Sequence, residues 1–147
     1  MMNAPNTPGK QVFKIFLSHS HTDSALARKI RSLIVHRLGL PVFMDEDLRA
    51  GESWRSKLRK ELEQAEMFIA LLTPQSASNP MLLAETGAAW SMDKPILALV
   101  TRQSVLERFP AQLRNFQVLD AQDLETPAGL EKFASALERS LAESFPA

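Results

Sequence analysis

Five short, mostly apolar runs alternate along the chain with longer stretches in which apolar residues recur every three or four positions. The runs comprise residues 12–17, 41–44, 67–72, 96–100 and 116–119. Short runs with few polar residues are typical of strands buried on both faces of a parallel sheet. Parallel strands need crossover connections, and these place helices over the sheet. The pattern therefore predicts an α/β domain with a five-stranded parallel sheet covered by helices on both faces.

The stretches between the runs carry signals for helix boundaries. Four predicted helices each follow a candidate N-cap: Thr22 or Asp23, Ser53, Asn79 and Thr126. Pro80 suits the first helical position after Asn79, and Gly39 is expected to end the first helix. Residues 104–109 are expected to form one or two helical turns. Residues 67–72 are the most apolar run and are placed centrally, whereas residues 116–119 are expected at the sheet edge.

Composition and charge agree with a single globular domain. The chain has 147 residues, 45% of them hydrophobic, and we expect residues 12–147 to form one domain after a flexible leader at residues 1–11. Seventeen basic residues balance seventeen acidic ones, which argues against direct nucleic-acid binding or an acidic membrane surface as partner. The chain has no Cys, no apolar run of membrane-spanning length and no signal-peptide pattern near its start, so a cytoplasmic protein is expected.

The topology predicts where a ligand would bind. In doubly wound sheets, ligands bind beyond the carboxyl ends of the strands, where the strand order reverses. Three polar loops follow the first three predicted strands, at residues 18–23, 45–52 and 73–79. We therefore expect these loops to bound a crevice.

Glu85 is the candidate functional residue nearest this crevice. It lies on the helix that starts after the third loop, among small neighbours at Ala84, Gly87 and Ala88. A Gly inside a helix costs about 1 kcal/mol relative to Ala, which suggests that something packs or binds closely there. Two interpretations stay open: a functional carboxylate facing the crevice, or a solvated carboxylate on a helix that packs tightly against the sheet.

Other polar and aromatic residues near the strand ends also admit two interpretations. Asp45 could contact a ribose hydroxyl, as acidic residues at strand ends do in such folds, or it could belong to a solvated loop. Trp54 is expected to be a core or helix-staple residue, with base stacking as the alternative. Trp90 is expected to pack, and Arg59 is expected on a solvated helix face.

The motifs of several common enzyme classes are absent from the sequence. Neither a phosphate-binding P-loop nor the glycine-rich dinucleotide fingerprint occurs. His19, His21 and Asp23 lack the partner cluster that a metal site would need, so no metal is expected. Ser18 beside His19 is not a catalytic triad, because no nucleophile elbow surrounds the serine.

Three segments together resemble Toll/interleukin receptor/resistance (TIR) domains. Residues 12–20, Val-Phe-Lys-Ile-Phe-Leu-Ser-His-Ser, resemble the first TIR box, a strand that ends in F-L-S-H or F-I-S-Y. Residues 47–54, Asp-Leu-Arg-Ala-Gly-Glu-Ser-Trp, look like the BB loop, although Ala50 stands where Pro is common. Residues 76–88 are similar to the segment S-x-x-x-W-x-x-x-E-x-x-x-A, with Met81 in place of the Trp and Glu85 in register with the Glu. The resemblance covers about residues 12–141 and implies a flavodoxin-like three-layer sandwich of strand order 2-1-3-4-5.

A second resemblance concerns the same helix. Glu85-Thr86-Gly87-Ala88-Ala89, followed by Lys94-Pro95-Ile96, is similar to the E-x-G-x-A and K-P-I signature of nucleoside deoxyribosyltransferase-like proteins. Both families have this layered fold, and both use a Glu to break an N-glycosidic bond.

The TIR resemblance implies a bacterial enzyme that cleaves nicotinamide from NAD, by hydrolysis or with cyclisation of ADP-ribose, in antiphage immune signalling. Glu85 would be the catalytic residue, and the substrate-binding candidates are Ser18, His19, Ser20, Asp45 and Trp54. NAD would be the substrate, with no separate cofactor, and self-association or other TIR domains would be the partners. The alternatives are a non-enzymatic TIR adaptor and a nucleoside-processing transferase or hydrolase.

Overall fold

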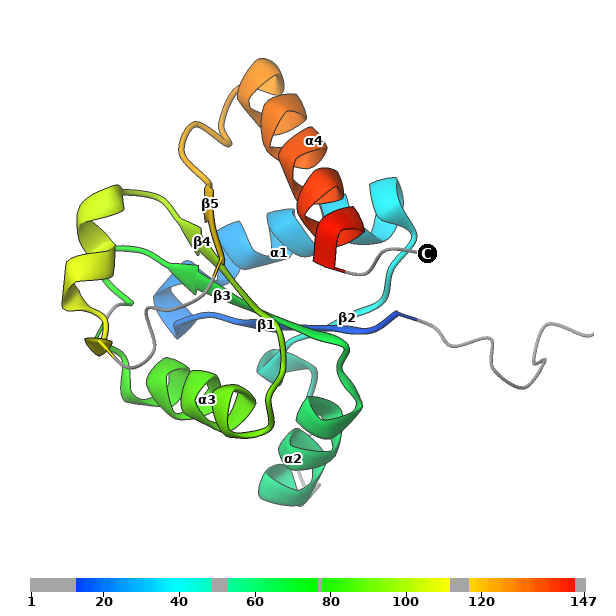
Figure 1. Cartoon of the computed structure of the whole chain (residues 1–147), viewed down its shortest axis with the longest axis vertical. Coiled ribbons are helices and arrows are strands. Elements are labelled where there is room, and N and C mark those ends of the chain that lie inside the picture. Colours follow the sequence, from blue (N-terminus) through cyan, green and yellow to red (C-terminus); the bar gives the residue numbers. More distant parts are fainter. Residues whose placement is uncertain (1–12, 49–52, 77, 112–116, 145–147) are drawn as a thin grey trace, which may run out of the picture.

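A five-stranded parallel sheet of order β2-β1-β3-β4-β5 forms the centre of the molecule, as predicted (Figure 1). The computed structural model describes residues 13–48, 53–76, 78–111 and 117–144. The strands are β1 (Ile15–Ser18), β2 (Val42–Phe43), β3 (Met67–Leu72), β4 (Ile96–Val100) and β5 (Gln117–Asp120). β3 is central and β5 lies at one edge, which confirms both expectations. The predicted leader, the tip of the BB-like loop at residues 49–52, and Phe116 lie outside the described residues.

The helices follow the predicted order. They are α1 (Ser24–Leu33), α2 (Trp54–Gln64), α3 (Pro80–Ser91) and α4 (Pro127–Ser144). α1 continues into a π-helical turn, η2 (Ile34–Leu38), and short 3₁₀ helices occur at η1 (His21–Asp23), η3 (Asp45–Asp47) and η4 (Gln103–Arg108). Gly39 ends the first helix with a positive φ of 68°, which glycine adopts readily. None of the described helices combines the length and apolar character needed to cross a membrane.

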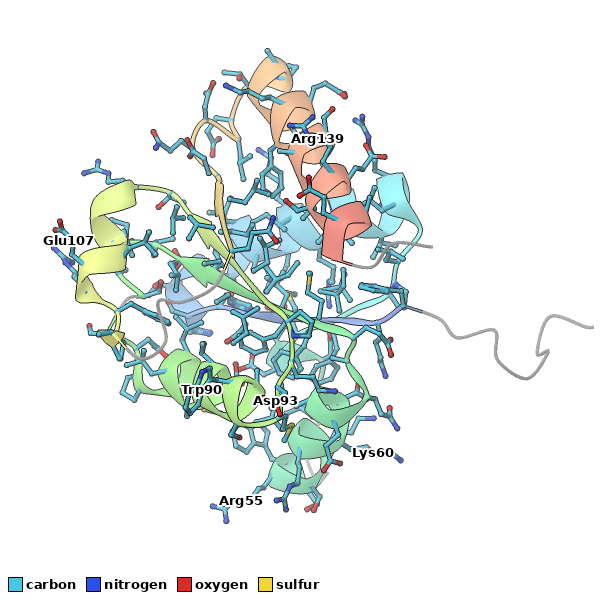
Figure 2. The ribbon with its side chains drawn as sticks, in the orientation of Figure 1. Arg55, Lys60, Trp90, Asp93, Glu107 and Arg139 are labelled. Atoms are coloured by element: carbon cyan, nitrogen blue, oxygen red, sulfur yellow. The ribbon has the colours of Figure 1, made fainter. Side chains whose placement is uncertain are left out.

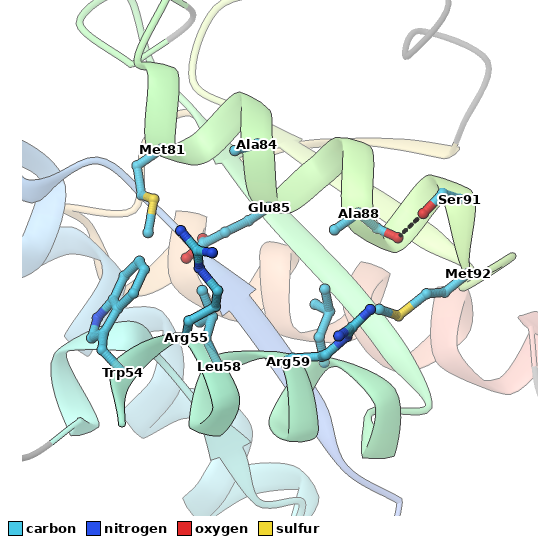
Figure 3. A pocket seen from close by; sticks show the side chains of 11 residues that line it. Trp54, Arg55, Leu58, Arg59, Met81, Ala84, Glu85, Ala88, Ser91 and Met92 are labelled. Carbon is cyan, nitrogen blue, oxygen red and sulfur yellow. Dashed lines mark hydrogen bonds between the residues drawn. The ribbon is translucent and has the colours of Figure 1, made fainter. Parts of the chain in front are cut away.

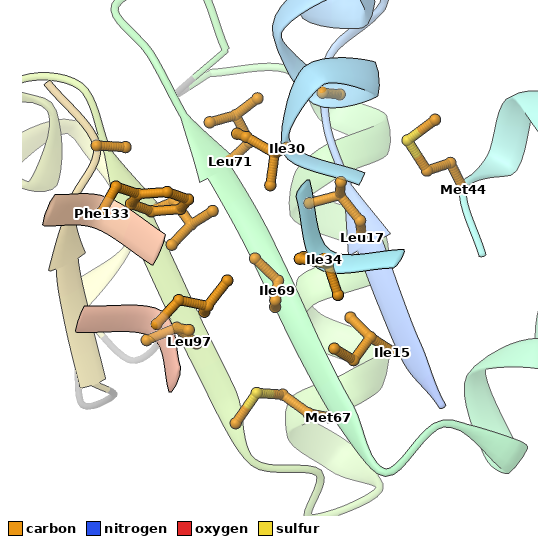
Figure 4. Close-up of a cluster of buried hydrophobic side chains, with 14 of the residues drawn as sticks. Ile15, Leu17, Ile30, Ile34, Met44, Met67, Ile69, Leu71, Leu97 and Phe133 are labelled. Carbon is orange, nitrogen blue, oxygen red and sulfur yellow. The ribbon is translucent and has the colours of Figure 1, made fainter. Parts of the chain in front are cut away.

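Two apolar clusters, one on each face of the sheet, produce the three layers. α1 and α4 cover one face, where buried residues of these helices pack on alternate strand residues (Figure 4). α2, α3 and η4 cover the opposite face. Ile15 and Leu17 of β1 belong to the first cluster and Phe16 to the second, because successive strand side chains point to opposite faces. The same alternation directs Ser18 toward the face covered by α2 and α3.

The capping predictions have mixed outcomes. The Asn79 side chain accepts a hydrogen bond from the Leu82 N–H at 2.9 Å, so the predicted start of α3 is confirmed. Asp23 and Ser53 occupy the predicted N-cap positions, which confirms where these two helices start, but their side chains make no capping hydrogen bond. The Asp23 carboxylate instead accepts from the Thr73 hydroxyl at 2.7 Å, which links the loops after β1 and β3.

Gly87 has a testable energetic consequence. A Cβ atom added at this position would meet no atom within 4 Å apart from its chain neighbours and the helix's own backbone, so no described residue packs closely there, and close binding of a ligand stays a prediction. Gly87→Ala is therefore expected to raise the free energy of unfolding by about 0.5–1 kcal/mol, because Ala restricts the unfolded chain and favours the helix. Urea denaturation measures this directly. Gly129→Ala is the matched control and should lose stability, since its Cβ would overlap the Asp123 carbonyl oxygen. A loss of stability in Gly87→Ala as well would contradict the open surroundings.

Candidate active site

Glu85 is a buried carboxyl group that β1 and α3 bring against a serine. Its residue is only 3% exposed, and its Oε1 accepts a hydrogen bond from the Ser18 hydroxyl at 2.5 Å. Ser18 reaches α3 because it ends β1 on the face that α3 covers. Glu85 Oε2 has no hydrogen-bond partner among the described residues. Buried polar atoms are almost always paired, so this oxygen, which is closed off from solvent, leaves the carboxyl group only partly satisfied.

The surroundings of Glu85 favour its neutral form. Burial has the largest effect and raises the pKa, because a carboxylate loses hydration inside the protein. The hydrogen bond from Ser18 lowers the pKa, whereas the nearby Asp45 carboxylate raises it by charge repulsion. Together these influences raise the pKa of Glu85 to about 8. A titratable group perturbed in this way is typical of catalytic sites.

A cavity of about 480 Å³ opens beside Glu85, between α2 and α3 (Figure 3). This volume is within the usual range for small-molecule sites. Its lining consists mainly of apolar side chains, with Glu85 and two arginines as the charged groups. The lining residues are Trp54, Arg55, Leu58, Arg59, Leu62, Met81, Ala84, Glu85, Ala88, Ser91 and Met92. Ala84 and Ala88 lie on this wall, so the small-residue face of α3 leaves space for the cavity.

This cavity differs from the predicted crevice. All its described lining residues except Met92 belong to α2 or α3, so two helices form it. Residues 49–52 and 77 of the loops expected to bound the crevice lie outside the described residues, so the crevice itself stays a prediction. The loop after β3 closes on itself, since the Ser76 hydroxyl accepts from the Thr73 N–H at 2.8 Å. Its contribution to the site is to start α3 at the point where the strand order reverses, between β1 and β3.

The structure gathers four of the predicted site residues. Ser18 contacts Glu85, Asp45 acts on it electrostatically, and Trp54 lines the same cavity. The Trp54 residue is 45% exposed, so the expectation of core packing is wrong for it. Trp90 is 56% exposed on the outer side of α3, and the packing expected for it is also wrong (Figure 2).

His19 and Ser20 are buried but directed elsewhere. His19 Nδ1 donates to the Ser20 carbonyl at 2.8 Å, and its Nε2 lies 3.5 Å from the Glu46 carboxylate. The Ser20 hydroxyl pairs with that of Thr22 at 2.7 Å. Neither residue lines the cavity beside Glu85. Their contacts hold the loop after β1 in shape.

Two arginines of the cavity, Arg55 and Arg59, are not among the predicted site residues. Arg59 is exposed, as expected for a solvated helix face, and it also lines the cavity together with the exposed Arg55. The sequence signal for them is their spacing, since Arg55 and Arg59 are four residues apart and flank the apolar stripe of α2. The stripe consists of Trp54, Leu58 and Leu62 and faces α3, so both arginines lie at the border of that face. The described residues contain no group of three or more acidic or histidine side chains that could hold a metal ion.

Fold and site together define a doubly wound α/β domain with a buried carboxyl group beside a ligand-sized cavity. The family model described as "TIR domain" matches residues 15–137, which is most of the chain. This chain therefore belongs to the TIR-domain family. A search of curated proteins finds no match.

Solved structures with similar folds include two sets of TIR domains. The TIR domain of the Toll-related receptor TRR-2 from Hydra magnipapillata matches with a TM-score of 0.68 and 16% identity, over 86% of this chain and 95% of that one. The TIR domains of the activated Roq1 resistosome, which recognises the pathogen effector XopQ, match with a TM-score of 0.67 and 13% identity, over 88% and 99%. The CMP N-glycosidase BcmB of Clostridium botulinum has a TM-score of 0.57 and 17% identity, over 85% and 98%. At these identities the likeness establishes the fold.

Proposed function

We propose that this TIR domain cleaves the bond between nicotinamide and ribose in NAD, with Glu85 as the catalytic residue. The observation that carries this proposal is the buried Glu85 carboxyl group, which Ser18 holds through one oxygen and which belongs to the wall of a ligand-sized cavity. The resemblance of this helix to two families that break N-glycosidic bonds supports the assignment. The similarity in fold to an N-glycosidase gives further support.

Cleavage of the bond between nicotinamide and ribose can be catalysed by a single carboxylate. As nicotinamide leaves, positive charge develops on the ribose, and a carboxylate beside the sugar lowers the energy of that transition state. Nicotinamide departs from a cationic ring as a neutral base, so it needs no proton from a general acid. Water, or a nucleophilic atom of the adenine, then forms the new bond to the ribose. The products are nicotinamide and either ADP-ribose or a cyclised isomer.

The raised pKa makes the protonation state of Glu85 depend on whether a cationic ligand is bound. In the empty site the neutral carboxyl predominates at neutral pH, because burial raises the pKa to about 8. A cationic nicotinamide ring bound beside Glu85 favours the carboxylate by charge attraction, and the proton passes to solvent. The substrate itself would therefore generate the catalytic charge.

Ser18 and Asp45 would orient Glu85 and a ribose hydroxyl, and Trp54 would stack on a planar ring at the cavity wall. Association with a second TIR domain would accompany activation, in a cytoplasmic role in antiphage immunity. The TIR domains of the Roq1 resistosome, an assembly that recognises a pathogen effector, support a link between this fold and immune signalling.

The test is direct measurement of nicotinamide. Purified protein, studied over a range of concentrations and under crowding, should release nicotinamide from NAD in amounts that match the NAD consumed, as quantified by chromatography. Deoxynucleosides and CMP serve as competing substrates and should remain intact. Cleavage of a nucleoside without cleavage of NAD would favour the transferase or hydrolase alternative. Self-association without binding or turnover of NAD would favour the adaptor.

A further inference from the structure

Arg55 and Arg59 are two cationic side chains that extend from α2 into the space facing α3 (Figure 3). Both line the cavity that Glu85 adjoins. They are four residues apart on one helix, so their Cα atoms are separated by about 6 Å along its axis. Two guanidinium groups at this spacing can each contact one phosphate of a diphosphate.

The charges of these arginines are not balanced within the described part of the chain. Arg55 and Arg59 are both exposed. No ion pair or hydrogen bond joins either of them to another described residue, whereas Lys57 on the same helix is paired. Lys57, two residues from each arginine, lies 3.2 Å from the Glu61 carboxylate, which also binds Lys14 at 2.8 Å. Like charges four residues apart on a helix repel each other, so an anion bound between Arg55 and Arg59 would relieve a small energetic cost.

Among the described lining residues, none supplies a negative charge that would pair with Arg55 or Arg59 in place of a bound anion. Glu85 is the only acidic residue among the described lining residues, and its elevated pKa keeps it largely neutral at neutral pH. The apolar walls reduce the local dielectric constant, which strengthens the attraction between a guanidinium and a phosphate. Arginine also matches phosphate in geometry, because its planar group can donate two parallel hydrogen bonds.

We propose that Arg55 and Arg59 form a phosphate-binding subsite that restricts the cavity to phosphorylated N-glycosides and excludes free nucleosides. The inference rests on the proposed function, because it assigns the substrate class of that same site. The arginines hold the diphosphate at the border of the cavity while the glycosidic bond lies beside Glu85. They are positioning residues for the substrate and take no part in the bond cleavage itself.

The test compares substrates and variants in NAD cleavage. Arg55→Gln and Arg59→Gln should each raise the KM for NAD about tenfold, as expected for loss of a charge-assisted hydrogen bond near the surface, with kcat nearly unchanged. Arg59→Lys should recover part of the loss. Lys60→Gln removes the same charge from an exposed position of α2 outside the cavity and should leave KM unchanged (Figure 2). Nicotinamide riboside, which lacks phosphate, should be a much poorer substrate than nicotinamide mononucleotide or NAD.

A binding measurement separates this inference from the catalytic proposal. ADP-ribose carries the diphosphate and lacks nicotinamide, so calorimetry with it reports the subsite without any turnover. Weaker binding of ADP-ribose to the Arg55→Gln/Arg59→Gln protein than to wild type, with adenosine weak for both, supports the subsite even if no NAD is cleaved. Equal affinity of ADP-ribose for wild type and the double variant, absence of binding to wild type, or an equal effect of Lys60→Gln would overturn it.

Discussion

Glu85→Gln will reduce nicotinamide release from NAD by about a hundredfold to a thousandfold, the size of effect seen when a group that stabilises transition-state charge is removed. Glutamine keeps the shape of the side chain and can still accept the Ser18 hydrogen bond that Glu85 Oε1 accepts at 2.5 Å. It cannot carry the negative charge that the developing ribosyl cation requires. Nicotinamide release by wild type and variant, measured at matched concentrations by chromatography, provides the comparison.

Two controls make this result specific to the catalytic charge. Glu63→Gln removes an exposed carboxylate from the same face of the molecule, on α2 but outside the cavity, and should retain full activity. The thermal stability of Glu85→Gln should match or exceed that of wild type above about pH 4.5, where the unfolded wild-type chain ionises Glu85 and the folded protein opposes that ionisation. Full activity in the folded Glu85→Gln protein would refute the assignment of Glu85 as the catalytic residue.

The fold was accessible from the sequence because its local signals agree with one another. Asn79 and Pro80 mark the start of α3, and the cap at Asn79 is present at 2.9 Å from the Leu82 N–H. The runs at residues 67–72 and 96–100 coincide with β3 and β4, since both are buried along their whole length. Failures occur where a polar side chain had a distant alternative. The Asp23 side chain does not cap its helix, because its carboxylate accepts a hydrogen bond from Thr73, a residue fifty positions later in the chain.

The site was only partly accessible, because its cavity depends on how two helices lie against each other. Glu85 could be located from its place on the helix after β3. The role of Ser18 as its hydrogen-bond donor requires the pairing of β1 with β3, and the positions of Arg55 and Arg59 require the orientation of α2 toward α3. Periodicity alone cannot distinguish a solvated arginine from one at a cavity border. It also gave no indication that Trp90 is exposed on α3.

The buried carboxyl group also makes the stability of the protein depend on pH. An unfolded chain gives Glu85 a pKa near 4.5, whereas the folded protein raises it to about 8. Between these values the folded state holds a proton that the unfolded state has released, so the free energy of unfolding must fall as the pH rises. The contribution of Glu85 is fully present below pH 4.5 and is lost as the pH rises to about 8. At about 1.4 kcal/mol for each pKa unit, the total change is a few kcal/mol.

Urea denaturation of wild type and Glu85→Gln at a series of pH values isolates this contribution, because the other titrating groups are common to both proteins. The stability advantage of the variant should grow with pH between about 4.5 and 8. Asp45→Asn should weaken the pH dependence, since it removes the charge that helps to raise the pKa of Glu85. Ser18→Ala should strengthen it, because the Ser18 hydrogen bond lowers that pKa. Parallel stability curves for wild type and Glu85→Gln would show that Glu85 is ionised in the folded protein, and the proposed generation of its charge by a cationic substrate would then fail.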